Sequence, residues 1–181
     1  TGGELIRILL HHPQVEINFV YSTTRAGKAV SSAHPDLLGT TDLIFTGNVN
    51  PNVNVVFLCL GHGNSTKFLN ENKFSKTTKI IDLSNDFRLK EDASLNGKQF
   101  VYGLPELNNT EILGANYIAN PGCFATAIQL GLLPLAKAGL LNAPIHVNAV
   151  TGSTGAGVCP SGTTHFSWRN NNASWYKPFT H

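Results

Sequence analysis

Apolar runs typical of buried strands alternate along this chain with segments typical of helices, and this alternation limits the possible folds most. Residues 53–60 form a continuous β-rich run, as expected of a parallel strand covered on both faces. Residues 79–83 form a second, shorter run, and residues 64–73 between them are typical of a helix. Strands separated by helices predict a Rossmann-like, doubly wound parallel sheet of the α/β class.

Three further segments fit this pattern. Residues 4–11 are predicted to form a helix that Pro13 closes, and the alternating residues 15–21 are predicted to form a strand. Residues 124–138, which are mostly small and apolar, predict another helix. Because ligands of such sheets bind beyond the carboxyl ends of the strands, we expect the functional residues in the loops that follow the strands.

Composition excludes several classes of protein. Of the 181 residues, 41% are hydrophobic and only 13% are charged, which indicates a folded chain with a sizeable core. The formal net charge of +2 is scattered along the sequence, so no nucleic-acid or membrane partner is expected. No apolar stretch reaches the roughly 20 residues of a membrane span. Three cysteines at unrelated spacings argue against disulfides or a zinc site, and we expect a cytoplasmic protein.

Cys123 is the candidate nucleophile. It follows the turn residues 120–122 and stands at the start of the predicted helix, where backbone N–H groups and the helix dipole would stabilise a thiolate. A buried structural cysteine is the plain alternative, because free cysteine is among the most buried residue types. This residue alone leaves both interpretations open.

Polar and glycine-containing segments at the other strand ends suggest a dinucleotide site. Ser22 and Arg25 follow the first predicted strand and could hold the 2′-phosphate of NADP, although an ordinary polar loop is the alternative. Thr1 and Gly2 could belong to the tail of a glycine-rich turn that binds a pyrophosphate at a helix N-terminus.

Charged residues near the strand ends allow two interpretations each. Arg88 could clamp a phosphate or carboxylate through its planar fork, or form a surface ion pair with Asp86 or Glu91. Asp82 is either a cap or an acid or base. His62, between two glycines, is more typical of packing near a cofactor or of a loop hydrogen bond than of proton transfer.

Six segments form an ordered set along the chain. They are TGGELIR at 1–7, LGHG at 60–63, DLSNDFRL at 82–89, VYGLPE at 101–106, ANPGC at 119–123 and GSTGAG at 152–157. In this order they resemble the N-acetyl-gamma-glutamyl-phosphate reductases of arginine biosynthesis, which are similar in plan to aspartate-semialdehyde dehydrogenase. The resemblance covers nearly the whole chain, and the combination of segments is specific, whereas the glycine-rich pieces alone are not.

The resemblance implies two domains. Residues 1–122 would form an NADP-binding Rossmann-like domain without its first strand, and residues 123–181 would begin a second α/β (α+β) domain for catalysis and dimerisation. The chain would therefore be an internal fragment of an enzyme that forms a homo-oligomer, a dimer or a tetramer.

The resemblance also implies a mechanism. Cys123 would attack an acyl phosphate, phosphate would leave, and the thioester would accept hydride from NADPH to give the semialdehyde. His181, or a neighbour beyond it, would be the acid/base, and Arg88 and Asn120 would bind phosphate oxygens. The residues implied for NADP binding are Thr1, Gly2, Ser22, Arg25, Gly61, Ser153, Gly155, Ala156 and Gly157.

The sequence departs from the family pattern after Gly157. A basic residue is often expected there, whereas Val158, Cys159 and Pro160 follow, and Cys159 is interpreted as a packing residue. Three other functions stay open at this point: a thiol hydrolase without nicotinamide, a non-catalytic NADP-binding module, and another cysteine-dependent aldehyde dehydrogenase. The acyl group, acetyl or succinyl, and the choice of NADP over NAD are open as well.

Overall fold

The computed structural model describes residues 1–157, 159 and 161–174. The chain divides into two compact units, Thr1–Lys137 and Ala138–His181. Within the described residues, all strands belong to the first unit, together with four α-helices and two short 3-10 helices. The second unit has one 3-10 turn and one short α-helix in its described part.

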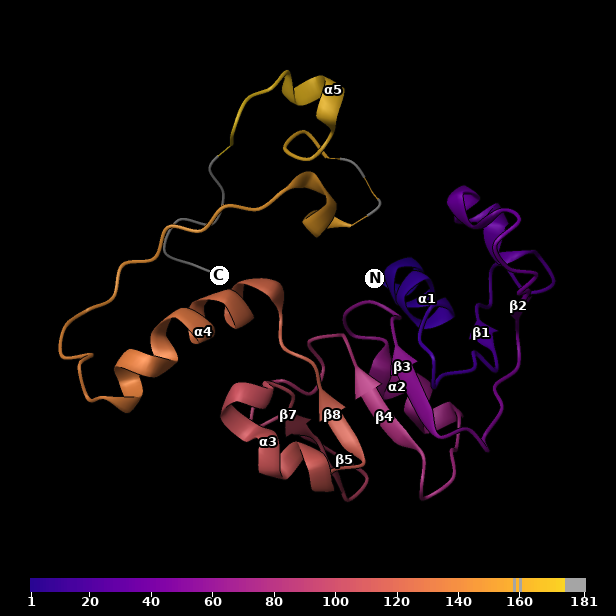
Figure 1. Ribbon diagram of the computed structural model, residues 1–181, viewed down its shortest axis with the longest axis horizontal. Helices are drawn as coiled ribbons and strands as arrows, with labels where there is room; N and C mark the ends of the chain where they lie inside the picture. Colours follow the sequence, from indigo (N-terminus) through magenta and orange to yellow (C-terminus); the bar gives the residue numbers. More distant parts are fainter. Residues whose placement is uncertain (158, 160, 175–181) are drawn as a thin grey trace. The chain divides into compact units, whose positions relative to one another are not determined.

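A four-stranded parallel sheet forms the centre of the first unit (Figure 1). Its strands lie in the order β3, β4, β8, β7, and every neighbouring pair is parallel. Helix α2 connects β3 to β4, and helix α3 connects β7 to β8, so parallel neighbours are joined through helices as in other α/β folds. The bounds are β3 (Val55–Leu58), α2 (Ser65–Glu71), β4 (Lys79–Asp82), β7 (Val101–Tyr102), α3 (Pro105–Gly114) and β8 (Tyr117–Ala119).

A second, two-stranded parallel sheet precedes this one in the chain. It pairs β1 with β2, helix α1 comes before β1, and two 3-10 helices lie between the strands. A short antiparallel hairpin, β5 and β6, turns through Asn96 and Gly97, both at positive φ as a two-residue hairpin turn requires. The bounds are α1 (Gly2–Leu10), β1 (Val20–Tyr21), η1 (Val30–Ser32), η2 (Pro35–Leu37), β2 (Phe45–Thr46), β5 (Ser94–Leu95) and β6 (Lys98–Gln99).

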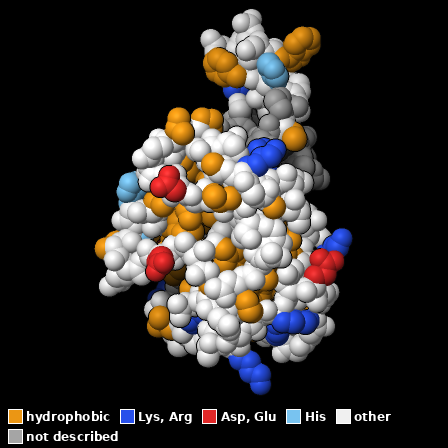
Figure 2. All heavy atoms as spheres, turned by 90° about the vertical axis from the view of Figure 1, so that its right-hand side faces the viewer, with side chains coloured by type: hydrophobic (Ala, Val, Ile, Leu, Met, Phe, Trp, Pro, Cys, Tyr) orange, Lys and Arg blue, Asp and Glu red, His pale blue; other side chains and the backbone are white. Residues whose placement is uncertain are grey.

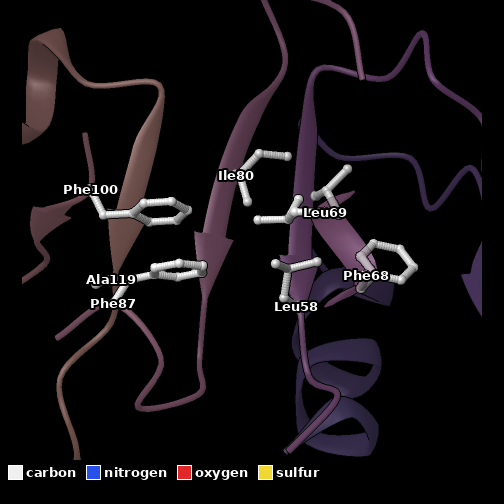
Figure 3. Packing of buried hydrophobic residues seen from close by; sticks show 8 residues of the cluster. Leu58, Phe68, Leu69, Ile80, Phe87, Phe100 and Ala119 are labelled. Carbon is white, nitrogen blue, oxygen red and sulfur yellow. The ribbon is translucent and has the colours of Figure 1, made fainter. Parts of the chain in front are cut away.

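The main core lies between the four-stranded sheet and α2 (Figure 3). Leu58 of β3 and Ile80 of β4 are almost completely buried, and Phe68 of α2 belongs to the same cluster. Phe87 and Phe100 stack with their ring centroids 3.9 Å apart. Because Phe87 is buried here, the segment that follows β4 is anchored to the core at the edge where ligands of such sheets bind.

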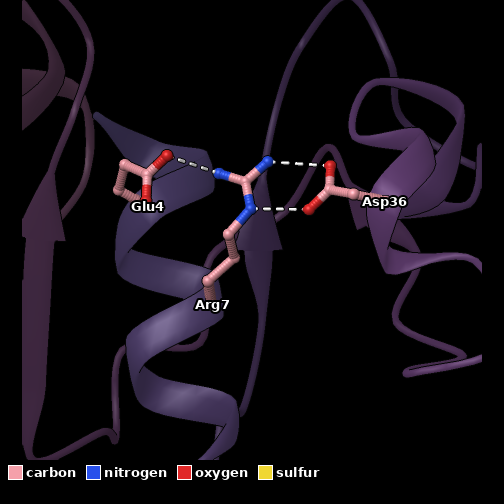
Figure 4. Close-up of polar contacts among 3 residues, drawn as sticks. All are labelled: Glu4, Arg7 and Asp36. Atoms are coloured by element: carbon pink, nitrogen blue, oxygen red, sulfur yellow. Dashed lines mark hydrogen bonds and ion pairs between the residues drawn. The ribbon is translucent and has the colours of Figure 1, made fainter.

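A smaller core and an ion-pair group fix α1 to the segment between β1 and β2. Ile6 packs with the buried residues Val30, Leu37 and Phe45. On the surface, the Arg7 guanidinium donates hydrogen bonds to both carboxylate oxygens of Asp36, at 2.6 and 2.8 Å, and to Glu4 at 2.8 Å (Figure 4). These bonds from Arg7 lower the pKa of Asp36.

Helix α4 (Cys123–Lys137) is the last element of the first unit, and η3 (Ser153–Ala156) and α5 (Phe166–Arg169) belong to the second. No helix in the described part of the chain is long and apolar enough to cross a membrane. On the face displayed in Figure 2, Lys, Arg, Asp and Glu side chains are scattered and form no large patch of one sign.

Most of the predicted elements are confirmed, with ends that differ by at most two residues. Helix α1 begins at Gly2, earlier than predicted, and the strand expected at 53–60 is limited to β3. The strand predicted over 15–21 is wrong for residues 15–19, since only Val20 and Tyr21 pair with β2. An alternating pattern needs a neighbouring strand of matching length, and β2 supplies only two residues.

Candidate active site

The carboxyl ends of β3, β4 and β8 lie at one edge of the sheet, because the three strands are parallel neighbours. Three segments continue from this edge: residues 59–64 after β3, residues 83–88 after β4, and residues 120–122 after β8. The predicted residues Gly61, Arg88, Asn120 and Cys123 all belong to these segments or follow them directly. The fold therefore gathers them at the edge that binds ligands in α/β sheets.

Cys123 is the first residue of α4 and is exposed. The Asn120 N–H donates to the Asp82 carbonyl at 2.8 Å, so pairing between β4 and β8 continues into the turn. The Gly122 carbonyl accepts hydrogen bonds from both the N–H and the hydroxyl of Thr126, each at 2.8 Å, which closes the first turn of the helix. The prediction that Cys123 stands where a turn becomes a helix is confirmed, and the alternative of a buried cysteine is wrong.

Arg88 lies against the turn that leads to Cys123. Its Nε donates to the Asn120 carbonyl at 2.8 Å, and its Nη2 donates to the Leu83 carbonyl at 3.0 Å. A Cβ on Gly122 would lie 3.0 Å from Nη1. Among the described residues Arg88 forms no ion pair, so the expected alternative of a pair with Asp86 or Glu91 is wrong.

Asp86 caps helix α2 from a distant segment. Its carboxylate accepts hydrogen bonds from the backbone N–H groups of Gly63 at 2.6 Å, Ser65 at 3.0 Å and Thr66 at 3.2 Å. Burial alone would raise the pKa of Asp86, but these donors, with Ser84, hold it below its usual value. The residue thus satisfies N–H groups that a helix cannot pair internally.

Asp82 is fully buried at the end of β4. It accepts hydrogen bonds from the Ser65 hydroxyl at 2.5 Å and the Ser84 hydroxyl at 2.6 Å. The Ser84 oxygen in turn accepts the Asp86 N–H at 3.0 Å. Of the two roles that the sequence left open, these contacts support the structural one, in which Asp82 ties α2 to the segment after β4.

His62 holds a loop hydrogen bond, as the sequence favoured. Its Nδ1 accepts the Asn85 N–H at 3.0 Å. The flanking residues Gly61 and Gly63 have φ of 81° and 80°, a left-handed conformation that favours glycine. The loop after β3 is therefore fastened to the segment after β4 by a hydrogen bond between a side chain and the backbone, with a partner that the sequence alone did not indicate.

Besides Gly61 in the loop after β3, the residues of the first unit that are predicted to bind the cofactor lie in two places. Helix α1 begins at Gly2, with Thr1 in the N-cap position, and a Cβ on Gly2 would lie 3.7 Å from that of Cys59 at the end of β3. Ser22 and Arg25 belong to the turn after β1, where the Ser22 N–H donates to the Thr46 carbonyl at 2.9 Å. The N-terminus of α1 and the end of β3 are thus adjacent.

The remaining predicted residues belong to the second unit or fall outside the described chain. Ser153, Gly155 and Ala156 are part of η3, and Gly157 follows it with φ of 92°. His181, the expected acid/base, lies outside the described residues. The roles of all these residues stay predictions.

The rate at which the Cys59 thiol is labelled, measured against pH, tests the environment at the end of β3. Although part of the residue is exposed, burial, together with the charge of Asp82, raises the pKa of its thiol. A raised pKa leaves less thiolate at neutral pH, and the thiolate is the form that reacts. At neutral pH we expect iodoacetamide to label Cys59 more slowly than a model thiol. As the pH increases, the labelling rate of Cys59 should keep rising after that of the model thiol has levelled off. Peptide mass spectrometry would measure this rate. In urea, Cys59 should react as a model thiol does, and equal rates in the folded protein would contradict the prediction.

Comparison with known families agrees with this fold. Residues 1–115 match the semialdehyde dehydrogenase NAD binding domain, and residues 123–181 match the semialdehyde dehydrogenase dimerisation domain. The chain belongs to the semialdehyde dehydrogenase family.

Within that family the chain is similar to proteins named N-acetyl-gamma-glutamyl-phosphate reductase. It is 68% identical to that of Flavobacterium johnsoniae and 64% identical to that of Christiangramia forsetii, in each case over the whole of this chain. The corresponding protein of Phocaeicola vulgatus is 54% identical. The chain spans about half the length of these relatives, 56%, 55% and 55% respectively.

Proposed function

We propose that the full-length protein is an NADPH-dependent acyl-phosphate reductase of arginine biosynthesis. It would convert N-acyl-glutamyl 5-phosphate to the 5-semialdehyde and release phosphate. The observation that carries this proposal is the setting of Cys123, an exposed thiol at the first residue of α4. The names of the similar proteins support the substrate and favour acetyl as the acyl group.

The proposed chemistry uses Cys123 twice. Its thiolate attacks the carbonyl carbon of the acyl phosphate, a C–S bond forms, and the bond to the phosphate oxygen breaks. After hydride reaches the thioester carbon, the C–S bond breaks, the aldehyde leaves, and the thiolate is regenerated. The N-terminal end of α4 carries a partial positive charge, which would stabilise the oxyanion formed at each step.

The described residues fit a dinucleotide cofactor. The N-terminus of α1 lies beside the end of β3, where Thr1 and Gly2 would hold a pyrophosphate. Ser22 and Arg25, in a turn without acidic residues, would hold the 2′-phosphate of NADP, and Gly61 would lie near the cofactor. We propose that Ser153 and residues 155–157 bind the nicotinamide end of this cofactor. When bound, the nicotinamide supplies the hydride.

Three further residues complete the proposed site. Arg88 and Asn120 would bind phosphate oxygens, since Nη1 of Arg88 makes no hydrogen bond within the described part of the chain. His181 would be the acid/base. We further propose a boundary between a cofactor domain, residues 1–122, and a catalytic domain starting at Cys123, through which the full-length protein would form a homo-oligomer.

The test asks whether oxidation of the semialdehyde requires inorganic phosphate as well as NADP. The full-length protein is given N-acetyl-glutamate 5-semialdehyde, NADP and inorganic phosphate, and absorbance is followed at the wavelength of NADPH. We expect NADPH to accumulate beyond one equivalent per active site only when phosphate is present, because phosphate must cleave the thioester before the next turnover. Parallel reactions with NAD and with the N-succinyl aldehyde measure the preference for cofactor and acyl group.

Two results would contradict the proposal. Release of free acid from a thioester without nicotinamide would indicate a thiol hydrolase. Binding of NADP without any turnover, together with a Cys123 that iodoacetamide labels no faster than a model thiol, would indicate a non-catalytic binding module.

A further inference from the structure

The segment after β4 holds two neighbouring elements, helix α2 and the turn before α4. Asp82 binds Ser65 and Ser84, and Asp86 caps α2. Arg88 reaches in the other direction, to the turn before Cys123. Phe87, between the last two, is buried in the core, so the backbone from which Arg88 extends is fixed.

The contacts of Arg88 are with backbone rather than with side chains. Nε and Nη2 donate to the carbonyls of Asn120 and Leu83, which follow two neighbouring strands. One planar guanidinium thus joins the two strand ends on either side of the β4–β8 ladder, a geometry that a lysine ammonium cannot reproduce. Hydrogen bonds from a charged donor are stronger than neutral ones.

The contact with Gly122 adds a steric reason for this arrangement. Nη1 lies 3.0 Å from the position that a Cβ on Gly122 would occupy. Glycine therefore allows the guanidinium to approach the residue directly before Cys123. The Gly122 carbonyl is also the acceptor that closes the first turn of α4, so the guanidinium lies against the residue that sets where the helix begins.

We propose that Arg88 is a positioning residue for Cys123, which fixes the turn at residues 120–122 and so the start of α4. This inference rests on the proposed function for its effect on turnover, but not for its effect on the turn. It assigns to Nε and Nη2 a role that is separate from phosphate binding, for which only Nη1 remains free in the described structure.

The test compares Arg88→Lys and Arg88→Gln with Lys90→Gln in the full-length protein. Lys90 is exposed and two residues away, so Lys90→Gln removes a charge from the same segment without touching the turn. In the protein without substrate or cofactor, we expect amide hydrogen exchange of the peptide spanning residues 118–126 to rise by about tenfold or more in both Arg88 variants. Lys90→Gln should leave that exchange unchanged.

Turnover and exchange together separate positioning from phosphate binding. For Arg88→Lys we expect kcat to fall about 10- to 100-fold, because a displaced nucleophile loses its alignment, and we expect this loss together with the faster exchange, whatever the change in the KM for phosphate. Unchanged exchange with a raised KM for phosphate would overturn the inference and leave a direct phosphate contact. If the reductase assay itself fails, hydrogen exchange still decides between these outcomes.

A second variant covers the case in which the Arg88 variants do not fold. Gly122→Ala keeps every charge but adds a Cβ 3.0 Å from Nη1, and Gly122 is not among the glycines at positive φ. It should raise amide hydrogen exchange of the peptide spanning residues 118–126, by a smaller factor than the Arg88 variants do. Exchange in β3 should stay at the wild-type rate. Wild-type exchange in the turn would count against the proposal.

Discussion

Cys123→Ser is expected to lower kcat of the phosphate-dependent reaction by about three orders of magnitude or more. A serine hydroxyl at this position is almost entirely protonated at neutral pH, so it is a much weaker nucleophile than a thiol. An oxygen ester would also accept hydride less readily than a thioester does. The exposed position of Cys123 at the start of α4 means that the substitution changes one surface atom and should leave the fold intact.

The matched control is Cys159→Ser. Cys159 is also an exposed free cysteine, but it does not stand at a helix start, so its variant should keep wild-type kcat and KM. Initial rates of NADPH formation, at saturating semialdehyde and phosphate, would measure both variants. Near-normal turnover of Cys123→Ser would exclude a covalent thioester mechanism.

Asp82→Ala is expected to lower the free energy of unfolding by about 3 kcal/mol. The carboxylate is fully buried and accepts hydrogen bonds from two buried hydroxyls, those of Ser65 and Ser84. Its removal leaves both hydroxyls without an acceptor at the point where α2 meets β4, and it also opens a small cavity. Urea unfolding of the full-length protein, followed by circular dichroism, would measure the loss.

Asp92→Ala provides the comparison for this prediction. Asp92 is exposed, and its side chain makes no hydrogen bond or ion pair within the described part of the chain. Its replacement should change stability by less than about 0.5 kcal/mol. Equal unfolding midpoints for the two variants would show that the Asp82 group does not support the sheet edge.

The sequence predicted those elements that local residues alone indicate, without knowledge of a partner elsewhere in the chain. The run at 53–60 and that at 79–83 mark β3 and β4, because a strand covered on both faces needs continuous apolar residues. Residues 120–122 marked the start of α4, because proline and glycine favour a turn there. The strand at 15–21 was predicted too long, since strand length depends on a partner that lies elsewhere in the sequence.

The candidate site was predicted as a set of residues but not as a set of contacts. Arg88 was expected to bind an anion or a carboxylate, yet its partners are two backbone carbonyls, which every residue carries and no sequence pattern marks. Asp86 was considered only as a partner of Arg88, although it caps a helix about twenty residues earlier. Both contacts depend on the register of neighbouring strands, which local sequence does not encode.

The most direct test of the account is the detection of the acyl group on Cys123. The full-length protein would be mixed with N-acetyl-glutamyl 5-phosphate in the absence of NADPH, quenched in acid and digested. Mass spectrometry should then find one N-acetyl-glutamyl group on the peptide that contains Cys123, and addition of NADPH before the quench should remove it as the semialdehyde. An unmodified Cys123 in the absence of NADPH, or an acyl group on another residue, would contradict the proposed mechanism.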